Sequence, residues 1–332
     1  MADAILVFGG AGYIGSHTCK ALHSAGLLPV VYDNLSTGHG YAVKWGPFIQ
    51  GDLNDPAKLD AAFKTYAPKA VIHFAANAIV LESMADPGKY YHNNVGGTVA
   101  LLEAMRHNNV KKIVFSSTCA CYGNPLFHPI TEKHPIQPMS PYGKSKWMCE
   151  EILRDFERAY DFEPTLLRYF NAAGADLETQ IGENHTPETH LIPRIIQTAL
   201  GLREEICVYG TDFTSKDGSA VRDYVHVMDL ASAHVMALAK PKCTVNIGAG
   251  TGFSVLEIIQ AVQQFCGKPI EVKLENRREG EPGVLCADNT KAKELLSWNP
   301  RFSDLPTIVE SAWKWHQLLH ENAHLVKSVL KC

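Results

Sequence analysis

The stretch Ala4-Ile5-Leu6-Val7-Phe8-Gly9-Gly10-Ala11-Gly12-Tyr13-Ile14-Gly15-Ser16-His17 decides the fold. Its first five residues form an unbroken apolar run, as expected of a parallel strand buried on both faces. Gly9, Gly12 and Gly15 then permit a sharp turn, a close approach to a pyrophosphate and tight packing of a helix on the strand. The amide groups and the positive dipole end at the start of that helix favour an anion. The pattern therefore predicts a dinucleotide site.

A second apolar run ends in Asp33, which lies 18 residues after Gly15. A carboxylate at this position binds the adenosine ribose hydroxyls and repels a 2′-phosphate, so NAD is favoured over NADP. Asp52 follows a third short strand, where it can meet the adenine amino group. Residues 70–76 form a fourth strand that runs into small residues, among them Ala75, which would let a cofactor lie against the backbone.

Strand and helix patterns alternate from residue 4 to about residue 170, where the sixth strand ends. This alternation predicts an α/β fold with a doubly wound parallel sheet of the Rossmann type. After Asn171 the sequence becomes polar and then mixes short strands and helices. We therefore predict an NAD-binding Rossmann domain over residues 1–171. A smaller mixed α/β domain for the substrate is predicted over residues 172–332, with some segments returning to pack on the first domain.

The segment Ser140-Pro141-Tyr142-Gly143-Lys144-Ser145-Lys146 begins a long helical pattern. Ser140 is a good N-cap, and Pro141 suits the first helical position. Tyr142 and Lys146 are four residues apart and share one helix face. A positive charge beside a phenol favours the phenolate, so we expect the pKa of Tyr142 to lie below its usual value of about 10. Such a phenol can take a proton from a sugar hydroxyl and later return it.

Two further patterns point to the substrate. The fifth predicted strand ends in hydroxyl residues at Thr118, where a side chain can bind the same substrate oxygen as Tyr142. Arg222 and the pair Arg277-Arg278 stand in the second half of the chain. Guanidinium groups bind phosphate oxygens through paired hydrogen bonds, so these arginines suit a diphosphate.

The composition argues against several classes of partner. The 332 residues carry a formal net charge of -4 without a long basic run, so no nucleic acid is expected. No apolar stretch approaches the ~18 residues of a membrane span, and no basic signal region precedes the first strand, so we predict a cytoplasmic protein that does not bind membranes. The nine cysteines are odd in number and scattered, which fits free thiols in a reducing compartment.

The C-terminal segment His320-Glu321-Asn322-Ala323-His324 matches the H-E-x-x-H zinc pattern. A zinc enzyme of that type takes a third ligand from a separate downstream segment. Leu325 to Cys332 contain no histidine and no acidic residue. We therefore interpret the segment as a C-terminal helix, and predict no metal.

Taken together, these motifs resemble those of the extended short-chain dehydrogenase/reductase family and, within it, the UDP-glucose 4-epimerases. The similarity runs over nearly the whole chain, and its carriers are the glycine-rich stretch, Ser140–Lys146, Leu167–Asn171, Arg222–Leu230 and Arg277–Gly280. It implies a tightly held NAD and the interconversion of UDP-galactose and UDP-glucose through a 4-keto sugar. It also implies that Tyr142 is the catalytic base, that Thr118 is the catalytic hydroxyl, and that Lys146 binds the nicotinamide ribose and lowers the Tyr142 pKa.

The same resemblance implies the remaining contacts. The cofactor residues are Gly9, Gly12, Tyr13, Ile14, Gly15, Asp33, Asn34, Asp52, Leu53, Phe74, Ala75, Asn93, Thr118, Tyr142, Lys146 and Phe170. The UDP-sugar residues are Thr118, Tyr142, Asn171, His190, Leu191, Tyr209, Arg222, Tyr224, Arg278, Glu281 and Leu285, with the uracil near Tyr209. A homodimer formed through helices near residues 94–107 and 141–160 is also implied.

Departures from the family pattern leave other substrates open. His190 and Glu281 stand where a well-known bacterial pattern has Asn and Asp. Leu285 stands where some members have Tyr, and a smaller residue leaves room for a 2-N-acetyl group. UDP-GlcNAc/UDP-GalNAc and UDP-xylose/UDP-arabinose therefore remain alternative substrates. A 4,6-dehydratase is disfavoured, because Cys119-Ala120 replace its Asp-Glu pair. A non-catalytic NAD-binding sensor is the remaining alternative, and it would be expected to lack Tyr142 or Lys146.

Overall fold

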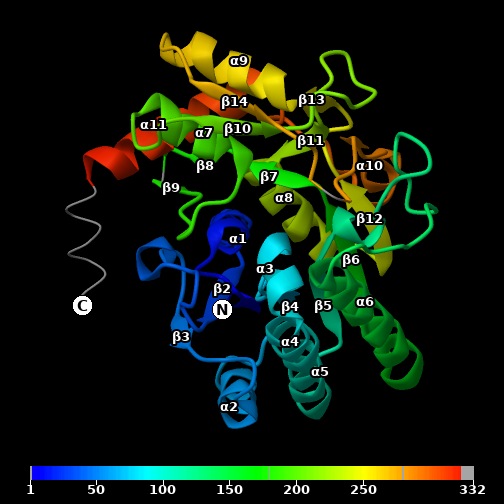
Figure 1. Ribbon diagram of the computed structural model, residues 1–332. Helices are drawn as coiled ribbons and strands as arrows, with labels where there is room; N and C mark the ends of the chain where they lie inside the picture. The colour runs from blue at the N-terminus through cyan, green and yellow to red at the C-terminus, as the bar shows by residue number, and fades with distance from the viewer. Residues whose placement is uncertain (1, 179, 279, 323–332) are drawn as a thin grey trace.

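The computed structural model describes residues 2–178, 180–278 and 280–322. Its centre is a sheet of seven parallel strands in the order β12-β6-β5-β4-β1-β2-β3, which confirms the predicted doubly wound sheet (Figure 1). The strands are β1 (Ala4–Phe8), β2 (Leu28–Asp33), β3 (Phe48–Gln50), β4 (Ala70–His73), β5 (Lys112–Thr118), β6 (Glu163–Tyr169) and β12 (Cys243–Ile247). The strand order reverses between β1 and β4, and ligands of such sheets bind at the carboxyl ends beside that point.

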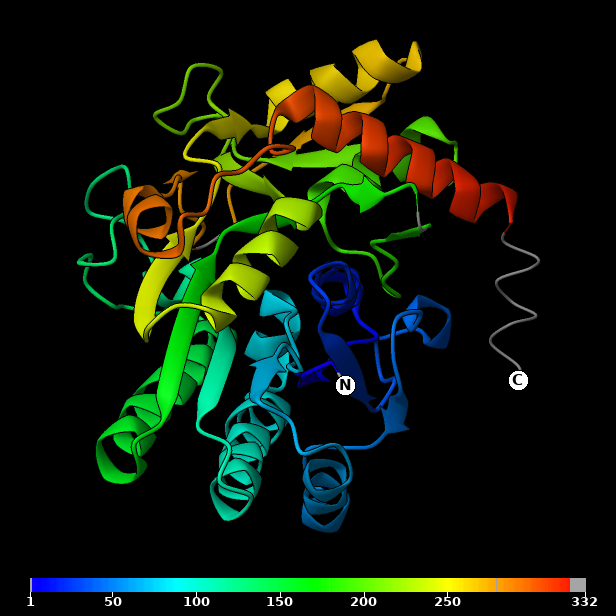
Figure 2. The same ribbon diagram turned by 180° about the vertical axis from the view of Figure 1, so that it is seen from behind.

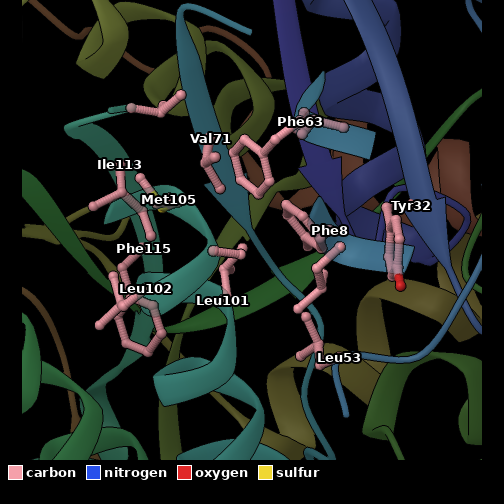
Figure 3. Close-up of a cluster of buried hydrophobic side chains, with 14 of the residues drawn as sticks. Phe8, Tyr32, Leu53, Phe63, Val71, Leu101, Leu102, Met105, Ile113 and Phe115 are labelled. Carbon is pink, nitrogen blue, oxygen red and sulfur yellow. The ribbon is translucent and has the colours of Figure 1, made fainter. Parts of the chain in front are cut away.

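Alternate residues of each strand point to opposite faces of the sheet, and both faces are buried. Leu6 and Phe8 pack with the helices α2 (Pro56–Tyr66), α5 (Gly97–His107) and α6 (Pro141–Tyr160). Figure 3 shows this cluster, in which Phe8, Phe63, Leu101 and Phe115 lie close together. Ile5 and Val7 pack on the other face with α1 (Tyr13–Ser24), α8 (Val227–Leu238) and α10 (Thr290–Leu296), which Figure 2 shows from behind.

Short elements connect β4 to α5 along the edge of this sheet. They are α3 (Val80–Ala85), α4 (Pro87–Tyr90) and a π-helical turn at Tyr91–Gly96. Two 3₁₀ turns, Gly40–Ala42 and Cys119–Cys121, follow β2 and β5. The second of these turns places Cys119 directly after the last residue of β5.

The C-terminal half builds a second, smaller body around its own apolar core (upper part of Figure 1). Its helices are α7 (Leu191–Ala199), α9 (Val255–Cys266) and α11 (Leu305–Glu321). Strand β10 (Ile206–Tyr209) pairs with β14 (Val272–Glu275), and β11 (Val221–His226) pairs with β7 (Asn171–Ala173), β13 (Gly252–Ser254) and β15 (Val284–Leu285). Strands β8 (Ala175–Asp176) and β9 (Ile181–Gly182) form a small antiparallel pair.

Besides α10, strand β12 and helix α8 of this later half belong to the layers of the large sheet. Strand β12 pairs with β6 along its whole length, so that Cys243 faces Thr165 and Ile247 faces Tyr169. Helix α8 packs on the face that α1 also covers. The chain therefore leaves the large sheet after β6 and returns to complete it.

The helix that begins at Pro141 starts as its sequence predicts. The Ser140 hydroxyl accepts a hydrogen bond of 3.1 Å from the Gly143 amide. At the other end of the chain, α11 ends at Glu321, and His324 of the H-E-x-x-H pattern lies outside the described residues. In the part of the chain that the structure describes, no helix is both long enough and apolar enough to cross a membrane.

Candidate active site

The glycine-rich loop joins β1 to α1 at the strand-order reversal. Gly9 has a φ of +79°, and a Cβ atom there would lie 2.7 Å from the amide nitrogen of Ala75. A Cβ atom on Gly15 would lie 2.1 Å from the carbonyl oxygen of Gly9. Only glycine fits either position, because backbone occupies the space of a side chain. Helix α1 begins after Gly12 without a side-chain cap or an acidic residue in its first turn, so its first amide groups face the site.

Asp33 ends β2 beside this loop. Its side chain is buried, and its carboxylate accepts hydrogen bonds from the amides of Ala11 at 3.0 Å and Leu35 at 2.8 Å. Burial raises the pKa of Asp33, and the two amide hydrogen bonds oppose that rise. The carboxylate is therefore held in one orientation next to the glycine-rich loop.

Asn34 and Asp52 form a second polar group one step further along the sheet. The Asn34 side-chain amide donates a hydrogen bond of 2.8 Å to the Asp52 carboxylate, which also accepts one of 2.9 Å from the Asn54 amide. The hydrogen bonds from Asn54 and then Asn34 lower the pKa of Asp52. Leu53 is buried in the core beneath this group. The structure thus brings together three of the residues predicted to bind the cofactor.

Residues at the end of β4 line the other side of the loop. The amides of Phe74 and Ala75 both donate to the carbonyl oxygen of Phe8, at 2.8 and 3.0 Å. The Phe74 ring packs against His234 of α8 at 4.6 Å between ring centres. Asn93, from the π-helical turn, donates a hydrogen bond of 3.0 Å to the side chain of Asn94.

Tyr142 meets Thr118 at the carboxyl end of β5. The Tyr142 hydroxyl is hydrogen-bonded to Thr118, and its ring packs edge-on against Tyr90 at 6.4 Å. Burial raises the pKa of Tyr142, Tyr169 raises it further, and the hydrogen bond with Thr118 opposes the rise. This direction is opposite to the lowering expected from the sequence, because burial disfavours the charged phenolate.

The orientation of Lys146 explains part of this correction. Lys146 is 3% exposed, and its ammonium donates a hydrogen bond of 2.8 Å to the carbonyl oxygen of Ser116. The ammonium also lies 4.9 Å from the centre of the Phe115 ring. Among the described residues, no carboxylate forms an ion pair with it, and burial lowers its pKa to about 8. Lys146 is therefore a buried cation that has one strong hydrogen-bond acceptor.

Two residues of this site are absent from the sequence prediction. The hydroxyl groups of Ser116 and Tyr169 form a short hydrogen bond beside Lys146. Tyr169 lies directly opposite Thr118 in the pairing of β6 with β5. Ser116 is two residues before Thr118, so both side chains point to the same face of the strand. This strand periodicity is the signal that could have identified Ser116 in advance.

Part of the predicted UDP group lies on β11 or on the segments next to it. Arg222 donates a hydrogen bond of 3.1 Å to Glu281, whose other carboxylate oxygen is buried without a hydrogen-bond partner. Tyr224 lies opposite Asn171, which donates a hydrogen bond of 3.1 Å to the carbonyl oxygen of Asp223. Burial raises the pKa of Tyr224 to about 12, so its phenol stays neutral at physiological pH.

Leu285 connects this group to the catalytic side. Strand pairing places Leu285 opposite Arg222. Its side chain also packs in the cluster that contains Cys119 and Phe170. The segment after Thr118 and the segment around Arg222 therefore share one apolar wall.

Arg278 and His190 lie in surroundings that the sequence did not indicate. The Arg278 guanidinium stacks on the Tyr209 ring at 3.6 Å, so both predicted residues are adjacent. His190 is the N-cap residue of α7, and Leu191 is the first residue of that helix. The Nδ1 atom of His190 lies 2.7 Å from the carboxylate of Glu183. The structure thus places His190 in ion pairs with acidic residues.

Comparisons with known proteins also indicate an NAD-binding epimerase. The model of the NAD dependent epimerase/dehydratase family matches residues 5–248. A UDP-glucose 4-epimerase of Rhizobium meliloti is 49% identical over 317 residues, which cover 94% of this chain and 96% of that protein. The structure of UDP-glucose 4-epimerase from Brucella ovis in complex with NAD is 48% identical, with a TM-score of 0.92 over 94% of this chain and 98% of that chain.

A third relative has a broader substrate range in its name. The UDP-Glc/GlcNAc 4-epimerase of Campylobacter jejuni is 40% identical, with a TM-score of 0.85 over 96% of this chain and 100% of that chain. The family model covers more than half of the chain, and the relatives are matched over nearly their whole length. The resemblance predicted from the sequence is confirmed. The chain belongs to the NAD dependent epimerase/dehydratase family, among its UDP-glucose 4-epimerases.

Proposed function

We propose that the protein is an NAD-dependent UDP-glucose 4-epimerase, an isomerase that interconverts UDP-galactose and UDP-glucose through a 4-keto sugar. The observation that carries the proposal is the meeting of Tyr142 with Thr118, one helical turn from Lys146, at the carboxyl end of β5. Because all strands of the sheet are parallel, this end lies on the same edge as the glycine-rich loop. Near full-length similarity to UDP-glucose 4-epimerases supports the assignment.

The residues around the glycine-rich loop fit NAD. The uncapped start of α1 offers amide groups to the pyrophosphate, and a Cβ atom at Gly9 or Gly15 would clash with backbone. The anchored Asp33 carboxylate offers acceptors to the ribose hydroxyls. The other cofactor contacts fall to Tyr13, Ile14, Asn34, Asp52, Leu53, Phe74, Ala75, Asn93 and Phe170. When bound, NAD supplies a hydride acceptor for C4 of the sugar, together with a positive charge.

Tyr142 and Thr118 handle the proton. Tyr142 takes the proton of the sugar 4-hydroxyl and returns it to the 4-keto oxygen once the sugar has presented its other face. The Thr118 hydroxyl, bonded to Tyr142, holds that same oxygen in place. Burial raises the pKa of Tyr142, so ionisation near neutral pH requires a positive charge close by. The cations available to supply it are Lys146, one helical turn away, and NAD when it is bound.

The residues around β11 hold the UDP part of the substrate. Arg222 and Arg278 bind the diphosphate through their guanidinium groups. The unpartnered carboxylate oxygen of Glu281 is an acceptor for a ligand hydroxyl or N–H group. The remaining contacts fall to Asn171, His190, Leu191, Tyr209, Tyr224 and Leu285. In this scheme residues 1–171 bind NAD and residues 172–332 bind the UDP-sugar, with β12 and α8 returning to the first part.

Two copies of the chain form a homodimer through α5, with the end of the π-helical turn before it, and α6. These helices expose large apolar side chains, among them Val99 at 38% and Met148 at 44%. Apolar groups exposed together support association with another protein surface. The eight cysteines of the described residues are all free thiols, which supports a place in the cytoplasm.

A coupled assay tests the activity. Purified protein first receives UDP-galactose without added NAD, and the reaction is stopped. UDP-glucose is then quantified in a separate step with UDP-glucose dehydrogenase, which is supplied with its own NAD. Formation of UDP-glucose by the wild type, and its loss in Tyr142→Phe, is the expected result. If denatured protein releases NAD but no UDP-glucose forms, the cofactor site stands and UDP-galactose is the wrong substrate.

A second candidate activity is the interconversion of UDP-GlcNAc and UDP-GalNAc. Leu285 is half-buried beside Cys119 and Phe170, where a larger side chain would fill space next to the sugar. The Campylobacter jejuni relative is described as acting on both sugar types. Turnover of UDP-GlcNAc by the wild type and its selective loss in Leu285→Tyr is the expected result. No turnover of UDP-GlcNAc by the wild type rejects this candidate, and UDP-xylose is then the next substrate to assay.

A further inference from the structure

Four side chains converge in the segment after β9. They belong to Glu183, His185, Glu188 and His190, and one nitrogen or oxygen atom of each lies within 4.8 Å of the others. Nδ1 of His190 lies 2.7 Å from Oε1 of Glu183 and 3.0 Å from Oε1 of Glu188. Nδ1 of His185 lies 3.2 Å from Oε1 of Glu183 and 3.9 Å from Oε2 of Glu188.

These spacings suit a tetrahedral metal ion. Zinc bonds to imidazole nitrogen and carboxylate oxygen are about 2.0–2.2 Å long, so neighbouring ligand atoms of a tetrahedral site lie about 3.3–3.5 Å apart. The four nitrogen–oxygen separations between the histidines and the glutamates, 2.7–3.9 Å, bracket that value. The ligand atoms can therefore reach an ion through small side-chain rotations.

The local charge also calls for a cation. The side chains of Glu183 and Glu188 are only 6% and 4% exposed. In the part of the chain that the structure describes, no lysine or arginine pairs with either carboxylate. Burial lowers the pKa of His190, but Glu183 and Glu188 outweigh it and raise that pKa, so its imidazolium offsets part of their charge. Two buried carboxylates remain costly unless the rest of that charge is compensated as well. A divalent ion supplies both charges and binds imidazole in its neutral form.

The backbone around the four side chains is held by other residues. The indole N–H of Trp315 donates a hydrogen bond of 2.8 Å to the carbonyl oxygen of Glu183. Oε1 of Glu188 accepts hydrogen bonds of 2.8 Å from the amides of Thr189 and His190. Partners of this kind orient the groups that bind a metal.

The same segment covers the glycine-rich loop. The His185 ring packs edge-on against Tyr13, with 6.4 Å between ring centres. His39 donates a hydrogen bond of 2.7 Å to the carbonyl oxygen of Asn184, and the Asn184 side chain donates one of 3.1 Å to the Tyr41 hydroxyl. A small pocket lies between this segment and the loop, lined by Gly12, Tyr13, Asn184 and His185 among others.

We propose that Glu183, His185, Glu188 and His190 bind one divalent ion of the zinc class, and that the ion fixes residues 182–190 over the cofactor loop. The proposal departs from the sequence-based prediction of no metal. It assigns the ion a structural role, since no residue of the cluster belongs to the Tyr142–Thr118 pair. Of the four residues, His190 is also a proposed UDP contact, and metal binding through Nδ1 leaves its Nε2 atom for that contact. Its consequence is a slower loss of bound NAD when the ion is present.

Metal analysis of untagged protein tests the site. The protein is stripped with a chelator, dialysed against Zn²⁺ and analysed by mass spectrometry of the metal, and a Co²⁺ sample is examined by visible absorption. One ion per chain and the intense visible bands of four-coordinate Co²⁺ are expected. Glu183→Gln and His190→Gln should lose the ion while their circular dichroism stays native.

Matched controls identify the ligands. His320→Gln removes the first histidine of the H-E-x-x-H pattern, and Glu103→Gln with His107→Gln removes an exposed His–Glu pair on α5. Both controls should keep the ion. Absence of stoichiometric binding, equal binding by His190→Gln and wild type, or loss of the ion in His320→Gln overturns the site. An unchanged rate of NAD release after chelation overturns its role in covering the loop.

Discussion

Helix α6 carries two buried charges, one turn apart, that have opposite surroundings. Glu150 is fully buried and accepts hydrogen bonds of 2.8 and 2.6 Å from Arg168, together with bonds from Ser117 and Arg154. Lys146 is as deeply placed but has one hydrogen-bond acceptor, the carbonyl oxygen of Ser116, and one aromatic contact. The Glu150 carboxylate is therefore compensated by several partners, whereas the Lys146 ammonium has few.

The pKa values record this difference. Burial would raise the pKa of Glu150, but the hydrogen bonds and charge of Arg168 outweigh it and the pKa is lowered. For Lys146 burial prevails, and the pKa falls to about 8. The fully paired Glu150 joins α6 to β5 and β6. A buried charge with few partners and a shifted pKa, such as Lys146, is typical of a functional site. Both residues are buried, so charge compensation, more than burial, distinguishes the structural residue Glu150 from the site residue Lys146.

Removing the Tyr142 hydroxyl should give the largest effect. Tyr142→Phe deletes the proton-transfer group and leaves the packing of α6 intact, so turnover of UDP-galactose should fall by about 10²- to 10⁴-fold. The free energy of unfolding should change by less than ~1 kcal/mol, because one hydrogen bond to Thr118 is lost. Steady-state kinetics and urea unfolding measure the two quantities. Near wild-type turnover would show that Tyr142 is not a catalytic residue.

Removing the compensated charge of Glu150 should have the reverse effect, with the larger change in stability and the smaller change in turnover. Glu150→Gln leaves the buried Arg168 without its carboxylate and should lower the free energy of unfolding by ~3–5 kcal/mol. The double variant Glu150→Gln with Arg168→Met removes both charges and should recover much of this loss. Chemical denaturation of the three proteins provides the measurement. Equal stability of wild type and Glu150→Gln would show that full compensation contributes little.

The lone cation should be visible in the pH dependence of stability. In NAD-free protein the pKa of Lys146 is about 8, below its unfolded value of ~10.4. Between these values the unfolded chain binds more protons, so the stability of the wild type should rise with pH relative to Lys146→Met, by up to ~1.4 kcal/mol per pH unit. Below pH 8 the difference should be constant. Urea unfolding of both proteins from pH 7 to 10 measures it, and a flat difference would place Lys146 among compensated groups.

A smaller effect should come from the edge of the compensated group. Ser117→Ala removes one hydrogen bond to Glu150, while both bonds from Arg168 remain. The free energy of unfolding should fall by about 1 kcal/mol, with turnover within twofold of the wild type. Differential unfolding and the coupled assay decide it. A large loss of turnover without a loss of stability would instead assign Ser117 a role in the active site.

Local signals in the sequence predicted much of the fold and the centre of the site. Gly9 is recognisable because a glycine-rich turn directly follows an apolar strand. Asp33 is recognisable because it ends the next apolar strand, a short distance along the chain. Tyr142 and Lys146 share a helix face by spacing alone, and the structure brings Tyr142 to Thr118. These features depend on periods of two to four residues, which the sequence displays directly.

Contacts between distant elements were not predictable in the same way. The buried partner of Glu150 is Arg168 on β6, and its identity depends on how α6 packs on the sheet. Packing also decides that Lys146 points to Ser116 and that burial raises the pKa of Tyr142. The cluster around His190 combines a loop with a helix N-terminus, and its charges become meaningful only once their burial is known.

The late return of β12 has a consequence for synthesis of the protein. Strand β6 ends at Tyr169, but its outer partner ends at Ile247, about 80 residues later. At roughly 5–20 residues per second, the ribosome needs about 4–16 s to deliver that partner. During this interval β6 is an open strand edge, able to pair with another nascent chain. Cotranslational protection of this protein therefore matters most in the time between the emergence of Tyr169 and that of Ile247.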